Sequence, residues 1–140
     1  MRAPQLSLIF ASVSALLVAA CANEEMPQAS DGQALFMQNC AVCHGGDAKG
    51  AGPMAGAMST PPPDLTLIAV RNNGAFPKAQ VLSSIDGYAK SDMTGPNMPE
   101  FGALLEGDLV PYDSGDGILT PTPRKLVALS QYLESIQAAR

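Results

Sequence analysis

Cys40-Ala41-Val42-Cys43-His44 carries more structural information than any other segment of this 140-residue chain. On one helical turn, residues i and i+3 point to the same side, so two thiols at this spacing can reach two vinyl groups on one edge of a porphyrin. The histidine that follows then points toward the iron. A C-x-x-C-H pattern is typical of c-type haem attachment. We therefore predict one covalent haem c, with Cys40 and Cys43 as thioether anchors and His44 as an axial iron ligand.

Three other interpretations of this motif are open. Thioredoxin-like redox pairs also use C-x-x-C, but near a βαβ pattern, and the sequence shows none. A structural zinc site needs four ligands, and outside the motif the chain has no other His and only Cys21. A simple disulfide between Cys40 and Cys43 would leave His44 incidental. The complete five-residue motif favours haem over all three.

A six-coordinate haem needs a second axial ligand on the face opposite His44. His44 is the single histidine of the chain, which excludes bis-histidine ligation. Methionine is the obvious alternative, because Met/His ligation is typical of haem electron carriers. Met98 is the favoured candidate, since it precedes a proline in a loop restrained by Gly and Pro, and Met93 comes next. Two further candidates, in the loop soon after the motif, are Met54 and Met58.

The N-terminal 20 residues predict a secretory signal peptide. They combine an early Arg, a charge-free apolar run from Leu6 to Ala20 and small residues at the end of that run. The run is short for a membrane span. The segment Leu17-Val18-Ala19-Ala20-Cys21 resembles the lipobox of bacterial lipoproteins, which implies an acylated Cys21. The alternative is a plain signal peptide with a cysteine near its cleavage site.

This N-terminus predicts the organisation of the chain. We expect a signal peptide over residues 1–20, a lipidated N-terminus and tether over 21–30, and a single domain over 31–140. The mature protein would then be a lipoprotein anchored to a membrane on the periplasmic side. Several acyl chains on Cys21 would hold it stably, because one chain alone binds only marginally.

The composition of the mature part narrows the function classes. From Ala22 onward there are 13 acidic and 7 basic side chains. Binding nucleic acid requires a positive face, so a nucleic-acid partner is excluded. Aromatic residues make up 5% of the chain and Trp is absent, so a haem would supply a large rigid apolar body for the core.

Periodicity and punctuation predict helices joined by loops rich in Gly and Pro, with no convincing strand. Ser30 and Gln33 have capping-box spacing at the start of a helix that runs into the motif. Asp64 is placed to cap a short helix. Thr122 as cap and Pro123 at the first position would open the last helix. The expected helical ranges after the motif are 65–71, 77–89, 99–105 and 122 onward, with a long irregular connection over 106–122.

Over residues 31–138 the chain resembles a class I cytochrome c. Four patches carry the resemblance in order: Gly32-Gln33-Ala34-Leu35-Phe36, Pro63-Asp64-Leu65-Thr66, Ile85-Asp86-Gly87 followed by Met98-Pro99-Glu100-Phe101, and Leu129-Ser130-Gln131-Tyr132-Leu133. The resemblance implies an all-α cytochrome c fold, with three main helices and short helices around one haem. It also implies that Met98 binds iron and that Gly32 and Phe36 touch the C-terminal helix. Residues 107–122 form a longer stretch than the family usually has there.

These observations predict a single-electron carrier of an exported respiratory or photosynthetic chain. We expect no enzyme activity and no small-molecule substrate, and we expect redox proteins as partners. Two alternatives belong to other classes. One is a haem enzyme or gas sensor with an open distal site. The other is a cytochrome subunit of a membrane-bound oxidoreductase.

Overall fold

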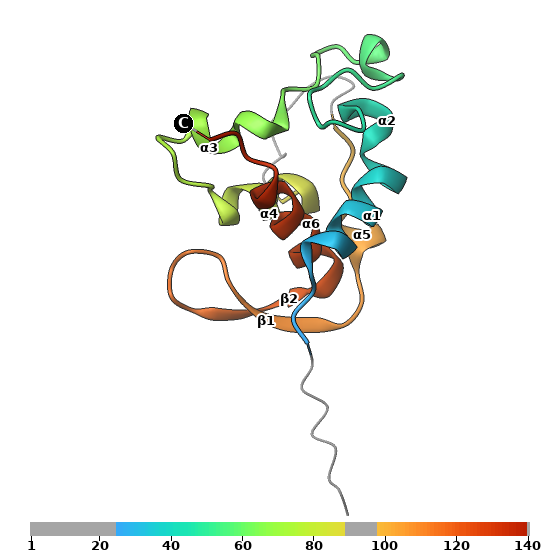
Figure 1. The fold of residues 1–140 in the computed structure, drawn as a ribbon. Coiled ribbons are helices and arrows are strands. Elements are labelled where there is room, and N and C mark those ends of the chain that lie inside the picture. Colours follow the sequence, from blue (N-terminus) through green and yellow to red (C-terminus); the bar gives the residue numbers. More distant parts are fainter. Residues whose placement is uncertain (1–24, 89–97, 140) are drawn as a thin grey trace, which may run out of the picture.

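Three main helices frame the computed structural model, which describes residues 25–88 and 98–139 (Figure 1). They are α1 (Ala29–Asn39), α4 (Lys78–Asp86) and α6 (Arg124–Ser135). The short helices are α2 (Ala41–His44), η1 (Ala55–Ala57), η2 (Leu65–Leu67), α3 (Ile68–Arg71) and α5 (Gly102–Leu105). This architecture confirms the predicted all-α class. The predicted signal peptide, Cys21 and Met93 lie outside the described residues. Within the described ranges, no helix has the length and apolarity needed to cross a bilayer.

The first and last helices cross closely and form the main core. A Cβ atom on Gly32 would collide with the carbonyl of Ala128 and with Cβ of Tyr132, so only glycine allows this approach. One turn further along, the ring of Phe36 lies 5.3 Å from the ring of Tyr132. Leu129 belongs to the same buried cluster. The predicted contact between Gly32, Phe36 and the C-terminal helix is therefore confirmed.

The predicted absence of strands is wrong for residues 109–123. Strands β1 (Leu109–Asp113) and β2 (Leu119–Pro123) form an antiparallel hairpin beneath α6. Val110 and Tyr112 point inward and are buried with Val127 of α6. Prolines inside both segments weaken the sequence pattern for strands. The strand pairing is stabilised because Val110 and Tyr112 cover part of the surface of α6. A local sequence pattern does not reveal such a contact.

The first helix starts earlier than its capping pattern predicts. It begins at Ala29, and the carboxylate of Asp31 accepts the backbone N–H of Gln28 at 2.9 Å. The predicted capping box of Ser30 and Gln33 is therefore wrong, because both residues already lie inside the helix. Residues 25–30, which were predicted to be part of the tether, also belong to the folded part. Met26 packs against the buried cluster that the hairpin shares with α6, and Pro27 is buried.

Other helix boundaries shift by a few residues for local reasons. Asp64 does cap its helix, since its Oδ1 accepts the backbone N–H of Thr66 at 2.8 Å. Helix α4 ends at Asp86 because Gly87 adopts a left-handed φ of 104°. Thr122 does not cap the last helix: it is paired with Val110 in the hairpin, and α6 starts at Arg124.

Candidate functional site

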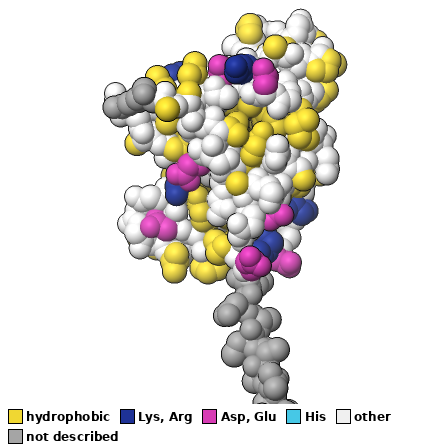
Figure 2. All heavy atoms as spheres, viewed as in Figure 1, with side chains coloured by type: hydrophobic (Ala, Val, Ile, Leu, Met, Phe, Trp, Pro, Cys, Tyr) yellow, Lys and Arg dark blue, Asp and Glu magenta, His cyan; other side chains and the backbone are white. Residues whose placement is uncertain are grey.

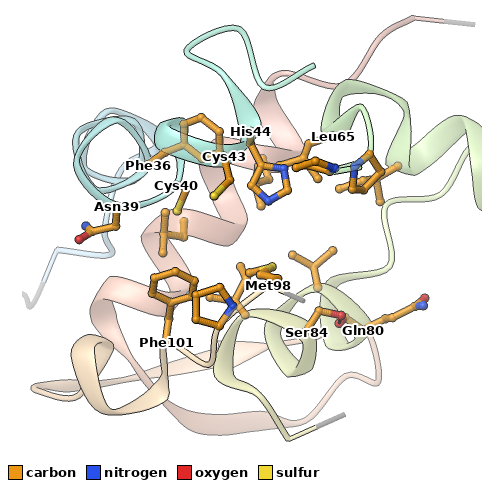
Figure 3. A pocket seen from close by; sticks show the side chains of 18 of the residues that line it. Phe36, Asn39, Cys40, Cys43, His44, Leu65, Gln80, Ser84, Met98 and Phe101 are labelled. Carbon is orange, nitrogen blue, oxygen red and sulfur yellow. Dashed lines mark hydrogen bonds between the residues drawn. The ribbon is translucent and has the colours of Figure 1, made fainter. Parts of the chain in front are cut away.

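A cavity of about 460 Å³ lies between the motif helix and α4 (Figure 3). Its volume falls within the usual range for ligand and cofactor sites. Helices α1, α4 and α6, the short helices α2, η2 and α3, and the segment after residue 97 all contribute to its wall. The lining is mainly apolar, with Phe36, Leu65, Ile68, Val81, Ile85, Phe101, Leu129 and Leu133 among its residues.

The helical turn of α2 presents the motif to this cavity. Cys40 and Cys43 are half-buried free thiols that line the cavity together with His44. The following loop is bonded back onto the turn: Gly50 N–H donates to the His44 carbonyl at 2.7 Å, and Gly52 N–H to the Cys43 carbonyl at 3.0 Å. A Cβ on Gly52 would lie 2.6 Å from the carbonyl oxygen of Ala41, so glycine is required for this return. The loop therefore holds the motif in a fixed position through contacts within the chain itself.

His44 is 8% exposed. Nδ1 is buried without a partner at strict hydrogen-bond geometry. Burial lowers the pKa of the His44 imidazole, and a hydrogen bond to the Pro63 backbone carbonyl opposes that shift. A carbonyl that binds one ring nitrogen would leave the other nitrogen for a metal.

The Cys40 thiol is in an environment that suppresses its ionisation. Burial raises the pKa of the Cys40 thiol to about 11, and the neighbouring Cys43 adds to the shift. A redox-active C-x-x-C pair instead needs a lowered thiol pKa, because the thiolate is the nucleophile. In the described part of the chain, no group of three or more His, Cys, Asp or Glu side chains could hold a metal ion. Neither observation favours the thioredoxin-like or the zinc interpretation.

Met98 lies on the wall opposite His44 (Figure 3). It is partly buried and packs against the main core cluster. Met58 also lines the cavity, but it belongs to the loop whose backbone is bonded to α2, on the His44 side. Met54 is 50% exposed and is not among the lining residues. Of the candidates inside the described residues, only Met98 faces His44 across the cavity.

Sequence reasoning did not single out several polar residues of the cavity wall. Arg71, Asn72, Gln80 and Ser84 all line it, and Arg71 Nη2 also donates to the Asp64 carbonyl at 2.8 Å. A usable pattern is present at the start of α4 and within it, where residues 77, 80, 81, 84 and 85 have the spacing of one helix face. The polar Gln80 and Ser84 alternate there with apolar side chains, so a search for an apolar stripe does not identify them.

The residues present fit a covalently held haem. Two thiols stand one helical turn apart, next to a buried imidazole whose Nδ1 has no partner at strict hydrogen-bond geometry. A thioether faces that imidazole, and the space between them is walled by apolar side chains. Donors of this kind, N from His and S from Met, are the usual axial pair of haem electron carriers.

Comparison with known proteins agrees with this geometry. The family model described as cytochrome c matches residues 29–136, which includes all the cavity elements described above. No curated protein and no solved structure gives a significant match to the chain. A family model that covers this much of the chain implies covalently bound haem c and supports haem-based electron transfer. The chain belongs to the cytochrome c family.

Proposed function

We propose that this protein is an exported single-electron carrier with one haem c, attached through Cys40 and Cys43 and ligated by His44 and Met98. The observation that carries the proposal is the placement of the Met98 side chain across the cavity from His44. A thioether at that position would hold the iron together with His44, which would leave no coordination site for a substrate. We further propose that the carrier serves a respiratory or photosynthetic chain and is anchored at Cys21 on the periplasmic side.

A haem held in this cavity supplies a one-electron couple at its iron. The chain's own contribution is to keep both axial groups in place in the two oxidation states, which keeps reorganisation small. His44 is held by the rigid α2 turn and its bonded loop, and Met98 by packing on the core. The apolar walls exclude water, and together with a thioether ligand they favour a higher potential.

The proposal is tested by absorption spectra of the purified holoprotein, oxidised and reduced, with and without carbon monoxide. We expect a low-spin c-type spectrum with a methionine–iron charge-transfer band, unchanged by carbon monoxide. In Met98→Ala the band disappears and carbon monoxide binds. Met58→Ala is the matched control, because it removes a thioether from the same cavity and should leave both properties intact.

The same measurement separates the alternatives. A high-spin spectrum, or ready carbon monoxide binding by the unaltered protein, would mean an open iron and would favour a haem enzyme or gas sensor. Purification of the protein in a stable complex with a catalytic subunit would instead favour a cytochrome subunit of a membrane-bound oxidoreductase. A free-standing carrier purifies without such a subunit and exchanges electrons with redox proteins only in transient encounters.

A further inference from the structure

The β1–β2 hairpin carries an apolar face that the rest of the described chain does not cover. Val110 and Tyr112 point into the core, so Leu109 and Pro111 point outward. Directly opposed residues of an antiparallel pair share a face. The register pairs Leu109 with Pro123, Pro111 with Pro121 and Asp113 with Leu119, so five apolar residues share this face with one carboxylate, Asp113, at the end next to the turn. Leu109 is 55% and Leu119 66% exposed, and Figure 2 shows apolar side chains over this end of the molecule.

The N-terminal end of the described chain is fixed to this hairpin. The guanidinium of Arg124, at the end of β2, donates from Nη1 to the carbonyl of Glu25. The backbone N–H of Arg124 donates to Asp108 at 2.8 Å and closes the base of the hairpin. Met26 packs against the buried cluster of Val110, Tyr112 and Val127. Glu25 is therefore held at the hairpin base.

The chain between this point and the proposed acylation site is short. Cys21 precedes Glu25 by four residues. Even fully extended, four residues span at most about 14 Å. An acylated Cys21 would therefore keep the hairpin base within that distance of a bilayer surface. The tether predicted from the sequence runs to residue 30 and would allow a larger distance, but residues 25–30 are part of the fold.

Charge indicates which kind of bilayer surface suits the hairpin. Asp113 and Asp116 lie at its tip, and both carboxylates are fixed by backbone N–H groups: Gly115 donates to Asp113 at 2.8 Å and Ile118 to Asp116 at 3.0 Å. An anionic surface attracts basic segments and would repel this acidic tip. The apolar face with an acidic tip therefore fits a zwitterionic lipid surface.

We infer that the hairpin's apolar face contacts the zwitterionic lipid surface and, with the anchor at Cys21, holds the domain in one orientation. This inference rests on the lipidation included in the proposed function. The free energy of interfacial binding grows with the apolar area buried in the lipid. The hairpin and the acyl anchor would therefore both contribute to membrane affinity. Helix α2 lies at the opposite end of the domain from the hairpin (Figure 1). The cysteine end of the cavity then faces away from the membrane, toward partners on the aqueous side.

The test uses the full lipidated holoprotein in phosphatidylcholine vesicles that contain a carbene-generating photoreactive lipid. Adducts are located by peptide mass spectrometry. We expect residues 109–121 to carry about ten-fold more adducts than the loop around Met54, because only the hairpin would reach the interface. Met54 is 50% exposed and provides an apolar reference on the α2 side of the domain. Replacing part of the lipid with phosphatidylglycerol should reduce labelling of the hairpin.

Variants make the result specific. Leu109→Ser combined with Leu119→Ser should abolish hairpin labelling, while Met54→Ser, the matched control, should leave it unchanged. Both hairpin side chains are exposed, so neither change removes core packing. The absorption spectrum and its insensitivity to carbon monoxide should be those of the unaltered protein in all variants, which separates this test from that of electron transfer.

Three results would overturn the inference. The first is a lipidated protein whose hairpin is no more labelled than the loop around Met54. The second is a mature N-terminus whose mass shows no acyl chain, which removes the anchor but does not affect the spectroscopic test. The third is a dimer in detergent-free solution that dissociates in the double variant, which would make the hairpin face an interface between two copies of this chain.

Discussion

Gly32 is the residue on which the crossing of α1 and α6 depends. The atoms that its missing side chain leaves room for include the backbone carbonyl of Ala128, and a backbone atom within a helix cannot move away by itself. The crossing in turn places Phe36, which packs its ring on Tyr132 and lines the cavity. The absence of a side chain at Gly32 therefore determines how closely α1 and α6 pack and where Phe36 lies in the cavity wall.

Gly32→Ala should destabilise the protein. The new methyl group forces the two helices apart, and overpacking of this kind costs about 1–3 kcal/mol. Urea unfolding of the holoprotein, followed by far-UV circular dichroism, measures the change. Gly56→Ala is the matched control, because no atom lies within 4 Å of its added Cβ and its backbone is not left-handed. Equal midpoints for the two variants would show that α6 can move aside without cost.

At the scale of elements, the turn of the hairpin is organised by one carboxylate. Asp113 Oδ1 accepts the backbone N–H groups of Gly115 at 2.8 Å and Gly117 at 3.0 Å. Both glycines have positive φ values, 113° and 78°, that other residues rarely adopt. These two hydrogen bonds are the main reason that the pKa of Asp113 lies below its ordinary value.

This shift predicts how the hairpin responds to acid. A carboxyl group with a lowered folded-state pKa stabilises the fold above its unfolded pKa of about 3.9, and that contribution disappears as pH falls through the folded value. Asp113→Ala should therefore lower the melting temperature at neutral pH, and the difference from the unaltered protein should shrink below about pH 4. Thermal melts at several pH values measure this.

The control for this experiment is Asp108→Ala, which removes an exposed carboxylate near the base of the hairpin without changing its turn. It should have a smaller effect at neutral pH than Asp113→Ala. A difference between Asp113→Ala and the unaltered protein that stays constant down to the lowest pH would contradict the prediction, since it would not depend on the ionised carboxylate.

At the scale of the whole molecule, the cavity is continuous with the core. Phe36, Val81, Ile85, Leu129 and Leu133 belong to the buried cluster and also line the cavity. A haem in this space would therefore complete the packing between α1, α4 and α6. A group that binds the folded state and not the unfolded chain stabilises the fold. Haem binding and core packing therefore contribute jointly to the free energy of unfolding.

Haem removal should therefore cost the protein its cooperative fold. In Cys40→Ala combined with Cys43→Ala, no thioether can form, and we expect loss of helical circular dichroism or a broad, non-cooperative melt. Met98→Ala is the control, because it removes an axial ligand while both thioether positions remain, and it should keep its helical signal. A double variant that melts as sharply as the unaltered protein would show that the fold is independent of the haem.

The sequence alone determined the features that lie within one or two helical turns. The spacing of Cys40, Cys43 and His44 is set by helix geometry, so their convergence on one side could be predicted without a fold. The cap at Asp64 depends on a residue two positions away, and it was predicted correctly. The first residues of α1 and α6 were not predicted correctly. Several capping residues were possible locally, and packing against neighbouring segments selected one of them.

Only the tertiary structure decided which distant segments meet. Four methionines were candidates for the position opposite His44, and the choice among those described depends on which loop crosses the cavity. The hairpin was missed because strand pairing is a contact between two segments, each of which has no independent preference for it. Likewise, Met26 and Pro27 resembled a polar tether until the hairpin provided a surface for them to pack on. Such long-range contacts depend on the whole path of the chain, and local spacing carries little information about that path.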